Sequence, residues 1–432
     1  MFKVTTDDIG SKSPEITESL DELARQGARR MILAALELEV DQYVQELRQL
    51  RDELDHAMVV RNGHAEDRTV HLGAGTVHVR APRVDDRRPA HHFSSKILPP
   101  YMRRSPRLEE ALPVLYLRGL STGDFSEALE ALLGPEAAGF SATTITRLLT
   151  VWQDEYRVWR KRSLEDRDYV YIWADGVHFN VRLEEDRLAC LVIMGVLPDG
   201  RKELAAIEDG YRESTESWAS LLRDLKHRGM SAPVLAMGDG GLGFWAALHE
   251  VYPQSQEQRC WKHKIGNVLD KLPKRLQPRA KAMLHEIMKA PDRESALQDI
   301  ERFSDEYGAR YPKAVDSLTK DQDQLLTFFD FPAEHWIHLR TTNPIESSFA
   351  TVKARTKKTK GAGSRNAGLA MAFKLLLSAE KRWRRLNAPH LVALVRAGVK
   401  FPNGQAQFIP VDDLPEDHLF AQTPSVYVAT EM

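Results

Sequence analysis

The sequence has few cysteines, no long apolar run and no apolar leader. Its two cysteines, Cys190 and Cys260, allow one bridge at most, which excludes a disulfide framework and predicts a reducing compartment. The longest apolar run, residues 188–197, is far shorter than a membrane span, and residues 1–20 lack the apolar core of a secretion signal. We therefore expect a cytoplasmic protein with no membrane partner.

Net charge is also nearly absent. The 60 Lys and Arg residues almost balance the 62 Asp and Glu residues, so the net charge of −2 favours no class of partner. Hydrophobic residues make up 42% and charged residues 28% of the 432 positions, which is typical of globular proteins and not of disordered chains. No internal repeat or low-complexity segment is visible. Local patterns therefore have to carry the functional argument.

The first part of the chain has mainly helical patterns. Residues 17–54 carry apolar side chains at helical spacing, whereas residues 69–80 alternate around a Gly-Ala-Gly turn and predict a β hairpin. The helical pattern returns over about 105–164, broken by glycine-containing turns at 119–123 and 139–141. This order of helices resembles a helix-turn-helix DNA-binding unit, although a plain helical bundle has the same spacing.

The pattern then changes to short strands. Strands are expected at residues 169–174, 188–197, 202–207, 234–238 and 256–260, with helices at 215–228 and 244–251. Three hairpin-like strands followed by alternating helix and strand predict an α/β fold with a mixed sheet and helices on its faces. Residues 264–340 have only helical periodicity and predict a helical insertion, after which helices are expected at 343–352 and 368–386.

Two aspartates follow predicted strands of this sheet. Asp175 comes directly after the first strand in Trp-Ala-Asp-Gly, and Asp239 comes directly after the fourth in Met-Gly-Asp-Gly-Gly. Ligands of open α/β sheets bind outside the carboxyl ends of the strands, so both carboxylates can share one site. Paired carboxylates repel unless a cation lies between them, and Mg²⁺ prefers such ligands together with phosphate. The pair predicts a phosphoryl-transfer metal site; the alternative is two turn residues.

Glu346 is the candidate for a third carboxylate. Asn343 is a good N-cap and Pro344 fits the first helical position, so a helix begins here with Glu346 beside its apolar stripe. The alternative is a capping box in which Glu346 pairs with Asn343.

A basic segment follows Glu346. Residues 347–379 contain seven Lys and Arg and no Asp or Glu, a local excess in a chain of net charge −2. A carboxylate at the start of such a segment fits a metal ligand beside a bound polyanion, whereas the alternative is a solvated basic helix and loop. The residues expected to contact DNA are Lys353, Arg355, Lys357, Lys358, Lys360 and Arg365.

Two further motifs suggest other ligands, a dinucleotide and zinc. Residues 238–243 match a dinucleotide fingerprint, but Asp239 would place an anion beside the pyrophosphate and the preceding strands are hairpin-like, which disfavours that role. Cys260 and His263 have the spacing of half a zinc site. No second pair follows at ligand spacing, which favours a structural role.

Together these segments resemble the bacterial branch of the Mutator superfamily of DDE transposases. The resemblance rests on WADGVHF with Asp175, MGDGGLGFW with Asp239, QRCWKHK with Cys260 and His263, and RTTNPIESSFATVK with Glu346. It spans about residues 60–385 with the motifs in the family's order. It implies a ribonuclease H-like mixed sheet core interrupted by a helical insertion and preceded by a mainly helical DNA-binding region with a small β hairpin.

The resemblance also implies an activity. The three carboxylates would be catalytic and would hold two Mg²⁺ ions, with Mn²⁺ as a substitute, for phosphodiester hydrolysis and strand transfer. Cys260 and His263 would support the core. The partners would be terminal inverted repeats, target DNA and further copies of the chain in a homodimer or larger assembly, in the nucleoid of a bacterial cytoplasm. A catalytically idle DNA-binding regulator and a nuclease without strand transfer are the alternatives.

The expected domain organisation follows the same divisions. The ranges are 1–60, a helical oligomerisation segment; 61–165, the DNA-binding region; 166–263, the first part of the core; 264–340, the helical insertion; 341–400, the final core helices with the basic segment; and 401–432, a C-terminal tail.

Overall fold

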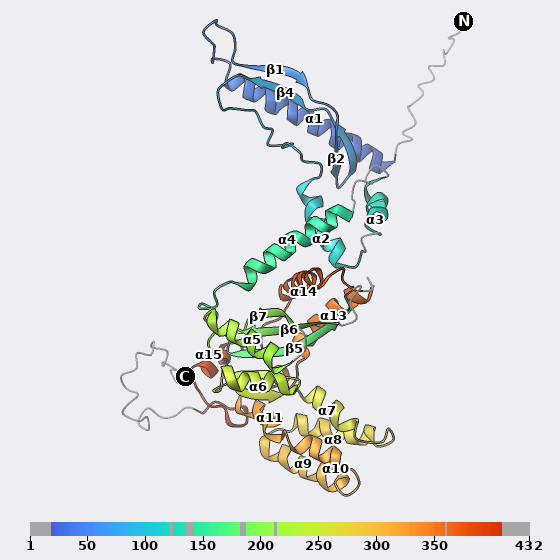
Figure 1. Ribbon diagram of the computed structural model, residues 1–432, viewed down its shortest axis with the longest axis vertical. Coiled ribbons are helices and arrows are strands. Elements are labelled where there is room, and N and C mark those ends of the chain that lie inside the picture. Colours follow the sequence, from blue (N-terminus) through green and yellow to red (C-terminus); the bar gives the residue numbers. More distant parts are fainter. Residues whose placement is uncertain are drawn as a thin grey trace, which may run out of the picture. The chain divides into compact units, whose positions relative to one another are not determined.

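The computed structural model describes most of the chain as two compact units. The described residues are 19–120, 124–134, 142–181, 187–210, 214–358 and 361–407. Contacts divide the chain into an N-terminal unit, residues 1–148, and a C-terminal unit, residues 149–432 (Figure 1). Among the described residues, no helix is both long enough and apolar enough to cross a bilayer.

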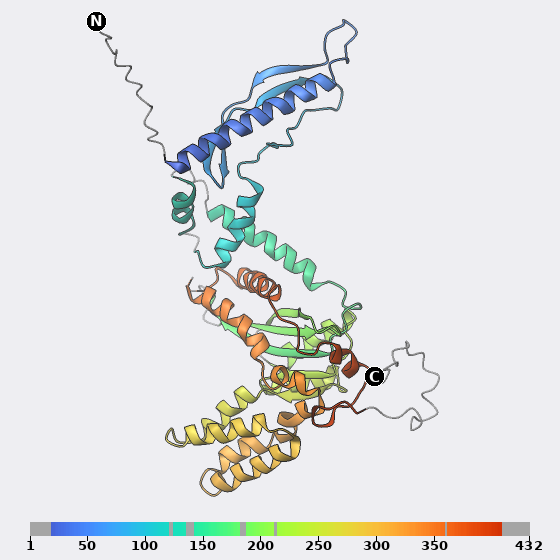
Figure 2. The ribbon, with the colours of Figure 1, turned by 180° about the vertical axis from the view of Figure 1, so that it is seen from behind.

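The N-terminal unit contains a long helix packed on short strands. Helix α1 begins after the Ser19 cap, whose hydroxyl accepts the backbone N–H of Glu22. The long blue helix α1 lies along the strands of this unit (Figure 2). Leu36 of α1 belongs to a small buried core with Val70 and Val77 of the strands. The elements are α1 (Leu20–Glu46), β1 (Val59–His64), β2 (Arg68–Leu72), β3 (Gly75–Val79) and β4 (Pro82–Asp86). The β2–β3 pair is the predicted hairpin, whereas the antiparallel β1–β4 pair was not predicted.

Three helices follow in sequence. They are α2 (Pro106–Leu117), α3 (Asp124–Leu133) and α4 (Ala142–Arg160). The Ser105 hydroxyl caps α2 by accepting the N–H of Leu108, and a proline occupies the first helical position. The predicted turn at 139–141 lies outside the described residues, as does most of the turn at 119–123.

The C-terminal unit is a mixed α/β fold built on a five-stranded sheet. Its strands are β5 (Tyr171–Phe179), β6 (Leu188–Val196), β7 (Lys202–Gly210), β8 (Leu235–Gly238) and β9 (Gln256–Arg259). Their order in the sheet is β7-β6-β5-β8-β9; β5, β6 and β7 are antiparallel neighbours, while β8 and β9 run parallel to β5. All five strands lie within a few residues of the predicted ranges. One expectation was wrong: β5 does not end before Asp175 but continues to Phe179, because the antiparallel ladder with β6 extends along the whole strand.

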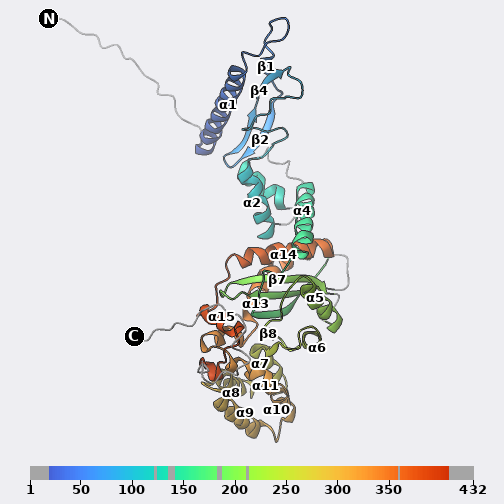
Figure 3. The same ribbon diagram turned by 90° about the vertical axis from the view of Figure 1, so that its left-hand side faces the viewer.

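Helices cover both faces of this sheet. Helices α5 (Thr215–His227) and α6 (Leu242–Val251) are labelled beside the sheet in Figure 3. Trp218 of α5 and Phe244 of α6 belong to a buried core that includes Ile172 and Ala174 of β5. Because side chains alternate along a strand, Tyr171 and Trp173 face the other side. There α13 (Asn343–Lys358) packs against β5, and α14 (Arg365–Glu380) packs against β7 and β6.

The predicted helical insertion forms a separate group of helices after β9. Its elements are α7 (Trp261–Leu269), α8 (Gln277–Lys289), α9 (Arg293–Tyr307), α10 (Pro312–Thr319), α11 (Gln322–Leu326) and α12 (Trp336–Leu339), and α15 (His390–Arg396) follows α14. A buried ionic cluster joins this group to the sheet: Asp321 accepts from both Arg259, the last residue of β9, and Lys264 of α7. The Lys264 side chain is 0% exposed, so this cluster links the end of β9, α7 and the residue before α11 inside the unit.

Candidate active site

Strand pairing brings Asp175 and Asp239 to the same edge of the sheet. The parallel β5–β8 ladder pairs Tyr171 with Leu235 and Trp173 with Met237. Continued by two residues, the same register places Asp175 opposite Asp239, although β8 ends at Gly238. Asp175 and Asp239 therefore lie toward the same end of two neighbouring strands, which stand roughly 4.8 Å apart.

Asp175 lies on the sheet face that carries α13. It is two residues beyond Trp173, whose indole N–H donates to the carbonyl of His338 at 3.3 Å on that face. The Asp175 Oδ1 accepts the backbone N–H of Gly176 at 2.8 Å, and the residue is partly exposed. Its strand position and half-buried surroundings therefore hold one carboxylate toward α13.

Asp239 lies in a tight turn between β8 and α6. Its Oδ1 accepts the N–H of Gly241 at 2.8 Å. Gly240 has a φ of +91°, and a Cβ there would lie 2.3 Å from the Arg259 guanidinium. Glycine is therefore required on two grounds, conformation and space. The turn directs Asp239 to the same edge as the end of β9, where the Cys260 N–H donates to the Gly238 carbonyl at 2.8 Å.

The start of α7 and the start of α13 are hydrogen-bonded to each other. The backbone N–H of Thr342 lies 3.3 Å from the Cys260 sulfur and its hydroxyl lies 3.2 Å from the same atom. In addition, the N–H of Trp261 donates to the carbonyl of Arg340 at 2.9 Å. Burial raises the pKa of the Cys260 thiol, but its interactions with His263 and Thr342 outweigh burial, so its pKa lies below the ordinary value. Cys260 therefore ties Glu346's helix to the sheet edge.

Glu346 is not part of the predicted capping box. That interpretation was wrong because the cap is shifted by one residue: the Thr342 carbonyl accepts the N–H groups of Ile345 and Glu346, and the Asn343 N–H faces Thr341 instead. The Glu346 carboxylate accepts the Thr342 hydroxyl at 2.7 Å and forms an ion pair with Lys262. Burial raises the pKa of Glu346, but these partners outweigh it and hold that pKa below its ordinary value.

His263 lies beside Glu346. Its Nε2 is 3.8 Å from Glu346 Oε1. The adjacent Cys260, together with the charges of Glu346 and Asp175, raises the pKa of His263 to about 9 despite its burial.

Of the predicted site residues, the structure brings three into direct proximity. Cys260, His263 and Glu346 have donor atoms that all lie within 4.8 Å of one another, and this tight group does not include Asp175 or Asp239. Sequence reasoning missed Lys262 and Thr342. Lys262 could have been found from the Cys-x-x-His motif, because it lies between Cys260 and His263. Nothing in the local sequence predicted the contact between Thr342 and Cys260, which are 82 residues apart.

The basic segment divides into exposed and engaged residues. Lys353, Lys357 and Lys358 are exposed on α13, whereas Arg355 is 4% exposed within it. The Arg365 guanidinium forms two hydrogen bonds with Asp209 of β7, at 2.7 and 3.0 Å. Lys360 lies outside the described residues. Of the six basic residues expected to contact DNA, the described part of the chain therefore exposes Lys353, Lys357 and Lys358 on α13.

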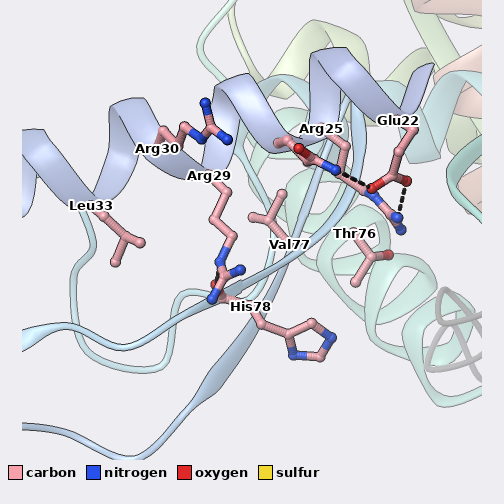
Figure 4. A pocket seen from close by; sticks show the side chains of 9 residues that line it. Glu22, Arg25, Arg29, Arg30, Leu33, Thr76, Val77 and His78 are labelled. Atoms are coloured by element: carbon pink, nitrogen blue, oxygen red, sulfur yellow. Dashed lines mark hydrogen bonds and ion pairs between the residues drawn. The ribbon is translucent and has the colours of Figure 1, made fainter. Parts of the chain in front are cut away.

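A basic groove lies within the N-terminal unit, between α1 and β3. It has a volume of about 390 Å³ (Figure 4). Its charged and polar lining comprises Glu22, Arg25, Gln26, Arg29, Arg30, Thr76 and His78. Arg29 extends from α1 toward β3, where its Nε donates to the His78 carbonyl at 3.0 Å, and Arg25 pairs with Glu22 (Figure 4). Three guanidinium groups against one carboxylate make the groove net positive.

Comparison with known proteins identifies the family. The model of the family described as "Transposase, Mutator family" matches residues 2–385. This chain therefore belongs to the Mutator family of transposases.

Individual relatives agree with that assignment. The transposase for insertion sequence element IS6120 of Mycolicibacterium smegmatis is 59% identical over 71% of this chain and 95% of the relative. The transposase for insertion sequence element IST2 of Acidithiobacillus ferrooxidans is 49% identical over 67% of this chain and 98% of the relative. The transposase for IS905 of Lactococcus lactis is 31% identical over 69% of this chain and 74% of the relative.

Proposed function

We propose that this protein is a DNA transposase that binds terminal inverted repeats and catalyses phosphodiester hydrolysis and strand transfer at Asp175, Asp239 and Glu346. We further propose that the sheet is a ribonuclease H-like core. Its order, with three antiparallel strands followed by two parallel ones, fits that core. The observation that carries the proposal is the parallel pairing of β5 and β8, the strands of Asp175 and of the turn with Asp239, with the helix that bears Glu346 packed against β5.

The donor set fits Mg²⁺. Three carboxylates offer hard oxygen ligands, and Glu346 is already compensated by the positive charges of Lys262 and His263. When bound, a pair of Mg²⁺ ions would supply an activated nucleophile and stabilise the leaving oxygen. The chain itself contributes position: β5 and the β8 turn hold two carboxylates, and the Thr342 bond orients the third.

The exposed lysines of α13 are proposed to contact the DNA backbone. Each phosphate contact that is lost should reduce the slope of log affinity against log salt concentration by about 0.9. Changing Lys357 and Lys358 to Gln should therefore lower that slope by about 1.8 and weaken binding to all sequences alike. Fluorescence anisotropy of repeat and unrelated duplexes across salt concentrations measures both. The matched control changes Lys281 and Lys313, two exposed lysines of the insertion, and an equal loss there would contradict a specific role for α13.

The groove of the N-terminal unit is proposed as a second contact to the DNA backbone. Changing Arg29 and Arg30 to Gln should again lower the salt slope by about 1.8, because two phosphate contacts are lost. The control changes Arg80 and Arg83, which are exposed in the same unit but do not line the groove. The same anisotropy titration measures the affinity of both variants. Unchanged affinity in a groove variant whose fold is confirmed by circular dichroism would show that the groove does not contact DNA.

A further inference from the structure

Three different metal-ligand side chains converge beside the sheet edge. Cys260 and His263 lie at the start of α7, and Glu346 lies in the first turn of α13. One donor atom from each lies within 4.8 Å of the others. The three come from two segments that Thr342 holds together, so the cluster is built by tertiary structure and not by sequence spacing alone.

The chemistry of this group differs from that of the three carboxylates. A sulfur, an imidazole nitrogen and a carboxylate oxygen suit Zn²⁺ and similar ions, whereas Mg²⁺ prefers oxygen ligands. Three protein ligands with the fourth position open is the usual pattern of a reactive zinc site. The sequence has no second pair of ligands after His263, but the fold brings in Glu346 as a third ligand.

The surroundings also fit a bound ion. The Thr342 backbone N–H donates toward the Cys260 sulfur at 3.3 Å, as an outer-shell donor does around a metal-bound thiolate, while the Thr342 hydroxyl donates to Glu346. The buried Nδ1 of His263 has no hydrogen-bond partner among the described residues. Lys262, which pairs with Glu346, is 55% exposed and can withdraw into solvent when a cation takes its place.

We propose that Cys260, His263 and Glu346 form a site for a zinc-class ion, separate in chemistry from the three-carboxylate site but sharing Glu346 with it. A zinc-class ion held there withdraws Glu346 from Mg²⁺ and so inhibits strand cleavage. This inhibitory consequence rests on the proposed transposase function, whereas the binding of the ion does not.

The test uses Co²⁺, which reports thiolate binding by its absorption. Titrating the reduced full-length protein should produce a sulfur-to-cobalt charge-transfer band and a tetrahedral visible spectrum, both removed by Zn²⁺. Cys260→Ala should abolish the charge-transfer band and weaken Co²⁺ binding by more than about 100-fold, beyond the usual effect of an outer-shell change. The matched control is Cys190→Ala, because Cys190 is also fully buried but lies within β6 with no such cluster. His263→Gln should weaken binding as well.

The outcomes separate the two proposals. Absence of the band in the unaltered protein, or its persistence in Cys260→Ala, would overturn the zinc-class site. Asp239→Asn should lose strand cleavage yet keep the band. If the unaltered protein shows the band but never cleaves DNA, the ion site stands and the transposase activity is refuted. In an active protein, Zn²⁺ should inhibit Mg²⁺-dependent cleavage over the same concentration range in which it removes the Co²⁺ band.

Discussion

Asp175→Asn, Asp239→Asn and Glu346→Gln should each reduce Mg²⁺-dependent cleavage of inverted-repeat DNA by about 1,000-fold or more. Each change removes a charged metal ligand, and several kcal/mol of transition-state stabilisation corresponds to such a factor. DNA affinity should change little, because the basic residues stay in place. Cleavage is measured on end-labelled duplexes, and affinity is measured on the same duplexes by anisotropy.

Matched controls make this expectation specific. Asp199 lies in the turn between β6 and β7, where it pairs with Arg201, and Glu216 is exposed at the start of α5. Asp199→Asn and Glu216→Gln should cleave at nearly the normal rate. Normal cleavage by any one of the three site variants would contradict the proposed set of ligands. Binding without cleavage by the unaltered protein would favour a regulator, and cleavage without joining would favour a nuclease.

Asp321→Ala should destabilise the C-terminal unit by about 3–5 kcal/mol. The change leaves the buried Lys264 ammonium without its carboxylate, and an uncompensated buried charge is costly. The Arg259 guanidinium, 13% exposed, loses the same partner. All eight tryptophans lie in residues 149–432, so tryptophan fluorescence during urea unfolding reports on this unit.

Two further variants test the reason for that loss. Asp316→Ala removes an exposed carboxylate from α10, near Asp321 in sequence, and should cost no more than about 0.5 kcal/mol. Adding Lys264→Met to Asp321→Ala should restore part of the stability, because it removes the buried charge that was left unpaired. A cost below about 1 kcal/mol for Asp321→Ala alone would mean that the cluster does not anchor the insertion.

Much of the sheet could be predicted because its signals are local. The apolar run of β6 and the Pro-Asp-Gly turn before β7 are visible in sequence, and both strands begin where they were expected. The end of β5 could not be predicted, since Asp175 and Gly176 read as a turn while pairing with β6 carries the strand past them. The β1–β4 pair was missed because its strands are separated by a complete hairpin.

The candidate site divides in the same way. The three carboxylates could be named because Asp175 and Asp239 each follow an apolar run that is typical of a strand, and Glu346 lies just after a recognisable helix start. Local reasoning misplaced the hydrogen bonds of Glu346, since Asn343 is as good a cap as Thr342 and only the contact with Cys260 distinguishes them. The sequence also could not predict which residues of the basic segment are exposed. Arg355 is buried and Arg365 binds Asp209, and counting charges detects neither.

The central claim is that Asp175, Asp239 and Glu346 hold metal ions together, and affinity cleavage tests it most directly. Fe²⁺ replaces Mg²⁺ in the full-length protein bound to repeat DNA, and ascorbate with hydrogen peroxide then generates hydroxyl radicals at the metal. We expect the polypeptide to be cut near residues 175, 239 and 346 at once, with excess Mg²⁺ suppressing all three cuts. Cuts near 346 alone, or cuts insensitive to Mg²⁺, would contradict a shared site.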